Sequence, residues 1–195
     1  AAKPLPLAER FAGCWKVLVA GSSWPQDEEI IIPYFNKHPN LKLVLAPHVV
    51  SEEHLQAIER QLARPALRYS KATPKAVAEV DCLIIDCYGL LSSIYRYASM
   101  AYVGGGFGVG IHNVPEAAVY GIPVIIGPNN KKFREAQALL RCGGCKEIAG
   151  AADFEQIMDA WLSDKEALAT AGKAAGSYIA DNAGAADRIF SKTLQ

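Results

Sequence analysis

Short apolar runs alternate with amphipathic segments along most of this chain. Each run is bounded by Gly, Pro, Ser or Asp, as buried parallel strands are. Five runs predict strands, and a weaker sixth follows: 17–20, 41–46, 82–86, 100–103 and 123–126, then 146–149. The segments between them predict helices over 27–35, 51–63, 91–98, 115–120 and 131–141. This alternation indicates βαβ units.

Parallel strands need right-handed crossovers, so the pattern predicts an α/β fold. We expect a Rossmann-like, doubly wound parallel sheet of about six strands with helices on both faces. A chain of 195 residues can bury about 70% of its unfolded surface, which is enough for one core. From residue 152 onward the pattern becomes a helical tail without a strand. Its expected caps are Asp153, Ser163 and Asn182, and its expected interruptions are Gly172, Gly176 and Gly184.

Charge and composition exclude several classes of protein. The 20 basic and 20 acidic side chains cancel, so the clustered positive charge of a nucleic-acid binder is missing. No apolar run approaches the roughly 18 residues of a spanning helix, and residues 1–7 lack the apolar stretch of a signal peptide. We therefore expect a soluble chain that does not bind nucleic acid.

The five cysteines are an odd set, and Cys82 and Cys87 lie in an apolar run. A disulfide framework is therefore not expected, and the compartment is predicted to be reducing. Cys142 and Cys145 have the spacing of a redox or zinc pair. Redox pairs normally open a helix after a strand, however, and no second pair supplies two more zinc ligands.

In open α/β sheets, ligands bind beyond the carboxyl ends of the strands. After the first predicted strand, Ser22 and Ser23 could offer hydroxyl and backbone donors to an anion, although a capped turn explains them equally well. After the second strand, Pro47 and His48 should lie on the same rim. His48 could equally be a packing or surface residue.

The third loop, 86–90, joins an apolar strand to a helix within a few residues. Backbone N–H groups around Tyr88, Gly89 and Leu90 could hold a phosphate or a base edge. A plain strand-to-helix turn is the competing interpretation.

The segment 104–110 has five glycines in seven positions after a strand. It fits neither the GxGxxG dinucleotide pattern nor a Walker loop. We interpret it as a binding loop in which Gly105 and Gly106 let the backbone approach a ligand. Asn113 is then expected to cap a helix that begins near Pro115.

Glu116 stands in the first turn of that predicted helix, where its charge would complement the helix dipole. Alternatively, its carboxylate could accept hydrogen bonds from a ribose diol. Further on, Lys131, Lys132 and Arg134 open the next helix and could face an anion, or simply solvent. We see no carboxylate pair for a metal and expect no metal site and no cofactor.

Together these motifs resemble one family. Asp86-x-x-Gly89, Gly104-Gly105-Gly106-Phe107, His112-Asn113-x-x-Glu116-Ala117 and the segment 120–128 are similar to the carboxy-terminal domain of bacterial 3-deoxy-D-manno-octulosonic acid (Kdo) transferases. The resemblance covers about residues 14–141. It implies one half of a GT-B glycosyltransferase fold, in which this half binds the donor CMP-Kdo and the amino-terminal half binds the lipid A precursor that accepts Kdo.

The resemblance makes 1–195 a donor domain, with 1–12 as an interdomain linker region and 152–195 as a helical tail. It implies that the acceptor domain and its general base are absent, so no catalytic residue is expected in this chain, and that transfer needs no metal. It also implies lipopolysaccharide biosynthesis at the cytoplasmic side of the inner membrane, with membrane association through the missing part. The family's nucleotide contacts carry over to Pro47, His48, Tyr88, Gly89, Leu90, Asn113, Val114, Pro115 and Glu116. Together with Ser22, Ser23, Gly105 and Gly106, which the loops themselves suggest, these are the expected donor-binding residues.

The sequence departs from the family pattern at four positions. His48 stands where an Arg is common, and Leu90 where a Glu is common. Gly106 replaces a frequent Ser, and Ile111 replaces a Gly. Two other functions stay open: a non-catalytic module that binds a nucleotide sugar or a partner, and a GT-B enzyme or epimerase that uses a UDP-sugar.

Overall fold

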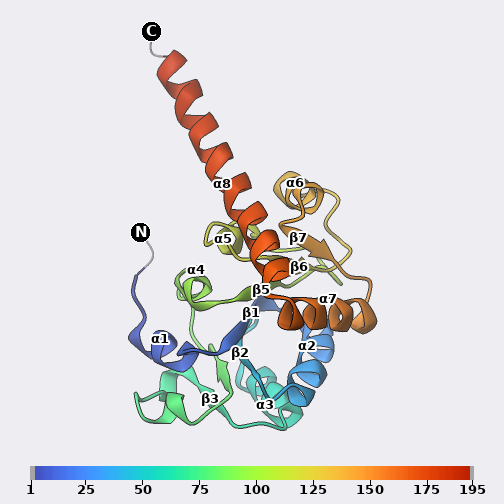
Figure 1. Ribbon diagram of the computed structural model, residues 1–195. Helices are drawn as coiled ribbons and strands as arrows, with labels where there is room; N and C mark the ends of the chain where they lie inside the picture. Colours follow the sequence, from blue (N-terminus) through green and yellow to red (C-terminus); the bar gives the residue numbers. More distant parts are fainter. Residues whose placement is uncertain (1–2, 194–195) are drawn as a thin grey trace.

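The computed structural model describes residues 3–193, and the side chains of residues 3–182. Its centre is a seven-stranded sheet in which every neighbouring pair is parallel (Figure 1). The strand order is β3-β4-β2-β1-β5-β6-β7. The strands are β1 (Lys16–Ser23), β2 (Leu41–Pro47), β3 (Ala66–Arg68), β4 (Cys82–Ile84), β5 (Met100–Val103), β6 (Val124–Ile126) and β7 (Cys145–Glu147). The predicted doubly wound fold is confirmed.

Helices cover both faces of this sheet. They are α1 (Pro6–Ala12), α2 (Pro25–Lys37), α3 (Glu52–Gln61), α4 (Leu91–Ile94), α5 (Pro115–Ala118), α6 (Arg134–Cys142), α7 (Ala151–Ser163) and α8 (Lys165–Thr193), with 3₁₀ turns η1 (Tyr69–Lys71), η2 (Ala76–Ala78) and η3 (Tyr95–Tyr97). In β1, Leu18 and Ala20 face a core shared with α2, α3 and α7. Val17 and Val19 face the opposite core, shared with α1, α4, α5 and α6. The two-residue period of the strand thus builds two apolar layers.

The seventh strand, β3, is an addition to the six that the sequence predicted. It has three residues and ends on Arg68, whose side chain is buried. Arg68 donates to Glu52 and Glu59 on α3 over 2.6–2.9 Å, which compensates the buried charge. A three-residue segment that ends in arginine does not resemble a buried strand in the sequence. Its burial becomes possible only because distant carboxylates compensate the charge of Arg68.

The region 1–12, expected to be a linker, contains a packed helix. In α1, Ala8 and Phe11 are buried against the sheet. Lys42 of β2 reaches this helix, and its Nζ donates to the Phe11 carbonyl at 3.0 Å. From Pro6 onward the chain is therefore part of the folded body.

Two of the predicted helix caps in the tail are wrong. Ser163 is the last residue of α7, and the side chain that accepts from the first N–H groups of α8 belongs to Asp164. Asn182 lies inside α8 and donates to Tyr178. Asp153 lies in the first turn of α7 and accepts from the Ala149 N–H at 2.7 Å, so it does bind backbone at the start of that helix.

The predicted interruptions at Gly172 and Gly176 are also wrong, because α8 continues through both. A Cβ at Gly172 would lie 2.4 Å from the Gly121 carbonyl oxygen, and one at Gly176 would lie 3.1 Å from the Gly121 Cα. These glycines let α8 approach the turn after α5 closely. Gly184 lies in the part of α8 whose side chains are outside the described residues.

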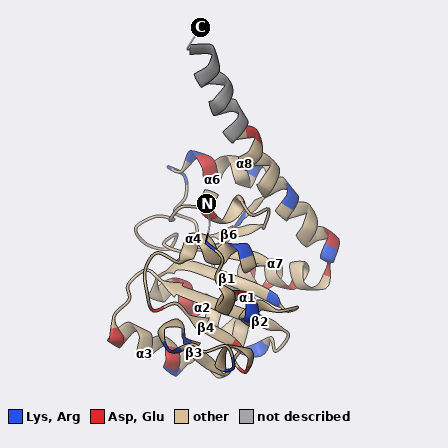
Figure 2. Ribbon diagram, turned by 90° about the vertical axis from the view of Figure 1, so that its left-hand side faces the viewer, with Lys and Arg blue, Asp and Glu red and all other residues tan. Residues whose placement is uncertain are grey.

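The direction of chain winding reverses between β1 and β5. From β1 the strands proceed outward to β3 on one side, and from β5 they proceed to β7 on the other. In such sheets the crevice beyond the carboxyl ends at this reversal is the usual ligand site. Acidic and basic residues are interspersed over the helices in the view of Figure 2 rather than gathered on one basic face. None of the helices in the described part of the chain is long and apolar enough to cross a membrane.

Candidate functional site

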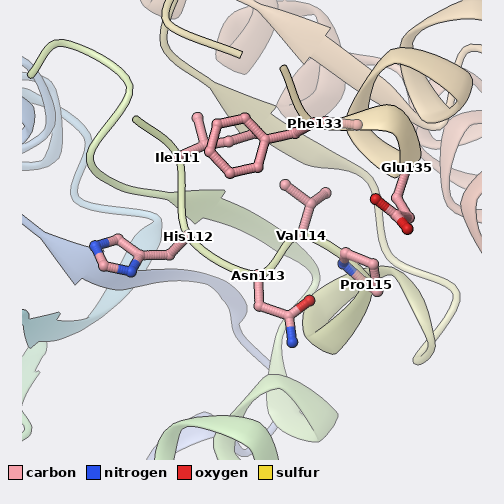
Figure 3. A pocket seen from close by; sticks show the side chains of 8 residues that line it. Ile111, His112, Asn113, Val114, Pro115, Phe133 and Glu135 are labelled. Carbon is pink, nitrogen blue, oxygen red and sulfur yellow. The ribbon is translucent and has the colours of Figure 1, made fainter. Parts of the chain in front are cut away.

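Two pockets lie at this carboxyl edge. The first, here the strand-end pocket, has a volume of about 190 Å³ and is lined by the ends of β1 and β2 and the loop after β4. The second, here the loop pocket, has a volume of about 240 Å³ and lies between the segment 111–115 and the start of α6 (Figure 3). The strand-end pocket contains the predicted residues Ser22, Pro47, His48, Tyr88 and Gly89, and the loop pocket contains Asn113, Val114 and Pro115.

Three aromatic side chains connect the pockets. His48 stacks on Trp24 with ring centroids 4.7 Å apart, and its ring lies 4.5 Å from that of His112. The Trp24 Nε1–H donates to His112 Nε2 at 3.3 Å. His48 lines the strand-end pocket and His112 lines the loop pocket. A ligand that occupies both pockets would therefore pass across these rings.

The hydrogen bond from Trp24 fixes the protonation of His112. An imidazole nitrogen that accepts a hydrogen bond holds no proton, so the proton of neutral His112 lies on Nδ1. Burial of the ring and the neighbouring His48 lower the pKa of His112. His112 is therefore a neutral side chain near physiological pH.

Asp27 of α2 organises the loops behind the two pockets. This buried carboxylate accepts three hydrogen bonds: from the Tyr102 hydroxyl at 2.6 Å, and from the backbone N–H groups of Trp24 and Gly105 at 2.9 Å. Burial and the charge of Asp27 raise the pKa of Tyr102, which keeps its hydroxyl proton in this bond. Asp27 thus joins the loop after β1 to the glycine loop after β5.

Internal packing accounts for the first three glycines of the loop. Gly105 has φ +93°, and a Cβ there would lie 2.3 Å from the Gly110 carbonyl oxygen. A Cβ at Gly104 would lie 2.3 Å from the Ser22 carbonyl oxygen, and one at Gly106 would lie 2.6 Å from the Gly127 Cα. These glycines therefore let the loop pack closely against other backbone, and their approach to a ligand stays a prediction. The Gly105 N–H, already bound to Asp27, is not available to a ligand.

The two serines after β1 have different roles. Ser23 is fully buried, and its hydroxyl donates to Glu28 at 2.8 Å, so the prediction that it offers a donor to a ligand is wrong. Glu28 also accepts from His54 Nε2 at 2.8 Å. Ser22 has φ +52° and lines the strand-end pocket. Only Ser22 of the pair is open to a ligand.

Asn113 does not cap α5 as predicted. The helix has four residues, its cap position is Val114, and the Asn113 amide donates instead to the Glu116 carboxylate at 2.9 Å. One turn generates little helix dipole. Among the described residues, however, the N–H groups of Asn113 and Val114 have no backbone acceptor. Each of these two N–H groups can donate a hydrogen bond to an anion without help from a helix dipole.

The loop after β4 presents an exposed turn. Gly89 has φ +84°, and Tyr88 is 75% exposed beside it. The Leu90 side chain packs against the apolar core and does not line the pocket, so a contact to a ligand there would have to use its backbone. Asp86, at the start of the loop, accepts from Ser70. The following helix α4 again has only one turn.

No Lys or Arg lines either pocket among the described residues. Lys131 and Arg134 line a different surface hollow, beside Tyr178, and neither of the two pockets. The described residues contain no cluster of His, Cys, Asp and Glu that could hold a metal ion. All five cysteines are free thiols, and burial raises the pKa of Cys145.

Sequence reasoning missed the aromatic stack and part of the loop pocket. Nothing in the sequence marks Trp24 as a site residue, although its indole binds His112 from 88 positions away. Phe133 and Glu135 reach the loop pocket from the start of α6, where Figure 3 shows the Phe133 ring over Ile111. No local signal marks these contacts, because they depend on how distant loops pack together.

Comparison with known proteins identifies relatives. No family model matches the chain. The chain is 34% identical over 137 residues to the 3-deoxy-D-manno-octulosonic acid transferase of Chlamydophila psittaci, which covers 67% of this chain and 31% of that protein. It is 29% identical over 166 residues to the enzyme of the same name from Rickettsia prowazekii, which covers 78% of this chain and 34% of that protein. The chain thus spans about a third of these curated relatives.

A solved structure has the same fold. The C-terminal CMP-Kdo binding domain of WaaA from Acinetobacter baumannii superposes with a TM-score of 0.74 at 21% identity, over 88% of this chain and 92% of that one. Its architecture is the carboxy-terminal half of a GT-B glycosyltransferase. The sequence and fold comparisons agree with the motifs at the carboxyl edge of the sheet. The chain therefore belongs to the 3-deoxy-D-manno-octulosonic acid transferase family and has the fold of its carboxy-terminal domain.

Proposed function

We propose that this chain is the donor-binding part of a glycosyltransferase that moves Kdo from CMP-Kdo to a lipid A precursor in lipopolysaccharide biosynthesis. The observation that carries the proposal is the pair of pockets joined at His48 and His112, in a chain whose relatives are named Kdo transferases. Work on a lipid acceptor would place the whole protein at the cytoplasmic side of the bacterial inner membrane.

The geometry suggests a division of the donor between the pockets. The exposed Tyr88 and the Gly89 turn offer a surface and backbone groups to the cytosine base. The phosphate would lie near His48 and the N–H groups of Asn113 and Val114. The half-buried Glu116, next to Asn113, would accept hydrogen bonds from the ribose hydroxyls.

During transfer, these residues would stabilise the leaving group. In transfer, the acceptor hydroxyl oxygen forms a bond to the anomeric carbon of Kdo, its proton passes to a general base, and the bond from that carbon to the phosphate oxygen breaks. CMP leaves with one more negative charge than the phosphate carried in the donor. N–H groups and an imidazole already positioned at the phosphate would stabilise that charge. We expect the acceptor site and the base to lie outside this sequence.

Titration with nucleotides tests the proposal. The chain is expected to bind CMP more tightly than UDP and CDP, and to show no Kdo transfer when given CMP-Kdo and a lipid acceptor. General base catalysis alone contributes about 10²- to 10⁴-fold, and positioning of the acceptor contributes more. Calorimetry and a transfer assay are the measurements. Robust transfer by this chain would contradict the expectation that the general base lies outside this sequence. His48, His112 or Glu116 would then be the candidates for the base.

Replacing Glu116 with Gln is expected to weaken CMP binding by about 1–3 kcal/mol, because a charged acceptor of the ribose hydroxyls becomes a neutral one. The amide can still accept from Asn113, so the fold should be retained. Calorimetry measures the affinity, and Glu29→Gln, at an exposed position of α2, is the control. Unchanged CMP affinity with a small loss of thermal stability would instead mean that Glu116 only complements the helix start.

A UDP-sugar enzyme is the second candidate, with a non-catalytic nucleotide-sugar module as a third. A diphosphate carries more charge than the single phosphate of a CMP-sugar. No Lys or Arg lines either pocket among the described residues, which favours the monophosphate donor. Tighter binding of UDP than of CMP in the same titration would support the UDP-sugar enzyme.

A further inference from the structure

We propose that the phosphate site uses an imidazolium as its cation, so that binding of CMP takes up a proton on His48. This inference rests on the proposed function and concerns the same site. It predicts that the affinity of the donor site depends on pH. A permanent cation at the same place would give an affinity that does not depend on pH.

Few side chains at the site can carry a positive charge. Of the side chains that line the two pockets, only His48 and His112 can become positively charged. A phosphate that passes between the pockets meets these two rings, whose centroids are 4.5 Å apart. Because two adjacent imidazolium ions repel each other, one proton at most is expected on the pair.

The hydrogen bond from Trp24 decides which ring takes that proton. Neutral His112 accepts from Trp24 Nε1 at 3.3 Å, and a protonated ring would have no lone pair for this bond. His112 is also half-buried in the loop after β5, where charging the ring is costly. Protonation of His112 would therefore break a contact between the two loops, which leaves His48 as the proton acceptor.

The surroundings of His48 favour a charge there. The ring is exposed and stacks on Trp24 at a centroid distance of 4.7 Å and an interplanar angle of 22°. An indole face stabilises a cation placed over it. The His48 backbone N–H donates to the Ser23 carbonyl at 2.9 Å, so the residue is held in place at the end of β2.

The other titratable groups near this stack are already engaged or stay neutral. Asp27 is occupied by three hydrogen bonds behind the glycine loop, and Glu28 binds His54 beneath Ser23. Across the strand-end pocket, burial raises the pKa of the Cys87 thiol, so it stays protonated. Tyr88 is the remaining titratable group on that wall, and its phenol cannot carry a positive charge. Asp86 accepts from Ser70 at the base of the loop.

The sign of the pH effect follows from this arrangement. A phosphate binds the protonated form of His48 more tightly, so affinity is highest where the free ring is already protonated and falls as pH rises. For one proton the limit is about tenfold per pH unit. The phosphate of CMP is itself almost fully ionised above pH 7, because its second pKa is about 6, so changes between pH 7 and 8.5 report on the protein.

Calorimetric titration of the chain with CMP tests the proposal. At pH 7.0 and 8.5, in pairs of buffers with different ionisation enthalpies, we expect proton uptake of up to one per CMP and at least about threefold weaker binding at the higher pH. Cytidine, which lacks the phosphate, should bind without proton uptake. CMP binding without proton uptake, or equal uptake with cytidine, would overturn the inference and leave the proposed function standing. Failure of CMP to bind at any pH would overturn both.

Variants of His48 locate the proton. His48→Arg should bind CMP at both pH values without proton uptake, because its charge is permanent. His48→Gln should bind CMP about tenfold more weakly at pH 7.0, with little further change at pH 8.5. His38→Gln is the control, since His38 stacks on Tyr34 at the far end of α2 and should keep the wild-type pH dependence. Proton uptake that persists in His48→Arg would assign the proton to another group and overturn the inference.

Discussion

Replacing Asp27 with alanine is expected to destabilise the chain by about 3–5 kcal/mol and to abolish measurable CMP binding. The substitution removes the acceptor for the Tyr102 hydroxyl and for the N–H groups of Trp24 and Gly105. Each buried donor left without a partner costs about 1–3 kcal/mol. Because two of the three donors belong to the loops around the pockets, the site is expected to lose its geometry together with the stability.

Chemical denaturation measures the stability of the Asp27 variant, and calorimetry measures its affinity for CMP. Glu29→Ala is the matched control, because it removes an exposed carboxylate from the same helix and should change stability by less than about 0.5 kcal/mol. Asp27→Asn, which keeps an acceptor of the same shape, should fall between them. An Asp27→Ala chain with wild-type stability would show that the loops are held by other contacts.

Replacing Gly105 with valine is expected to weaken CMP binding by at least about 100-fold and to lower stability by about 2–4 kcal/mol. The position has φ +93°, which strains a β-branched residue, and the new Cβ would lie 2.3 Å from the Gly110 carbonyl oxygen. The loop cannot relieve this contact without moving the N–H that binds Asp27 and the neighbouring His112.

Gly108→Ala in the same loop is the control for this variant. Its Cβ would meet nothing closer than the Gln26 side chain at 3.8 Å, so binding and stability should change little. Thermal unfolding measures the stability of both variants, and titration measures their affinity for CMP. The comparison separates the effect of the close contact at Gly105 from the effect of losing any glycine in the loop. If Gly105→Val kept its affinity for CMP, the glycine loop would be a structural turn and the ligand site would lie elsewhere.

The fold was predictable because its signals are local. Strands such as β1 and β2 are apolar runs bounded by turn residues, and Ser51 was correctly placed at the start of α3, where its hydroxyl accepts from the His54 N–H. Because parallel strands end at one shared edge of the sheet, Ser22, His48 and Gly89 were expected to lie close together. All three line the strand-end pocket. The missed strand β3 has no such signal, since Arg68 is buried only through its ion pairs.

The side-chain geometry of the site was less predictable. Strand periodicity gives no reason to separate Ser22 from Ser23, but an irregular register at the end of β1 and a left-handed φ at Ser22 leave one in the pocket and bury the other. The contact of Trp24 with His112 likewise depends on two loops that meet at the reversal of strand order. Such contacts are set by tertiary packing, which no sequence period encodes.

The reversal of strand order also means that the two pockets belong to different halves of the sheet. The strand-end pocket belongs to the half with β1, β2 and β4, and the loop pocket to the half with β5 and β6. A nucleotide that contacts both acts as a bidentate ligand, since binding at one half raises the effective concentration of its other end at the second half. Fragments of the donor that reach a single pocket lose this chelate advantage. The binding free energies of two such fragments are expected to add up to less than the binding free energy of the intact donor.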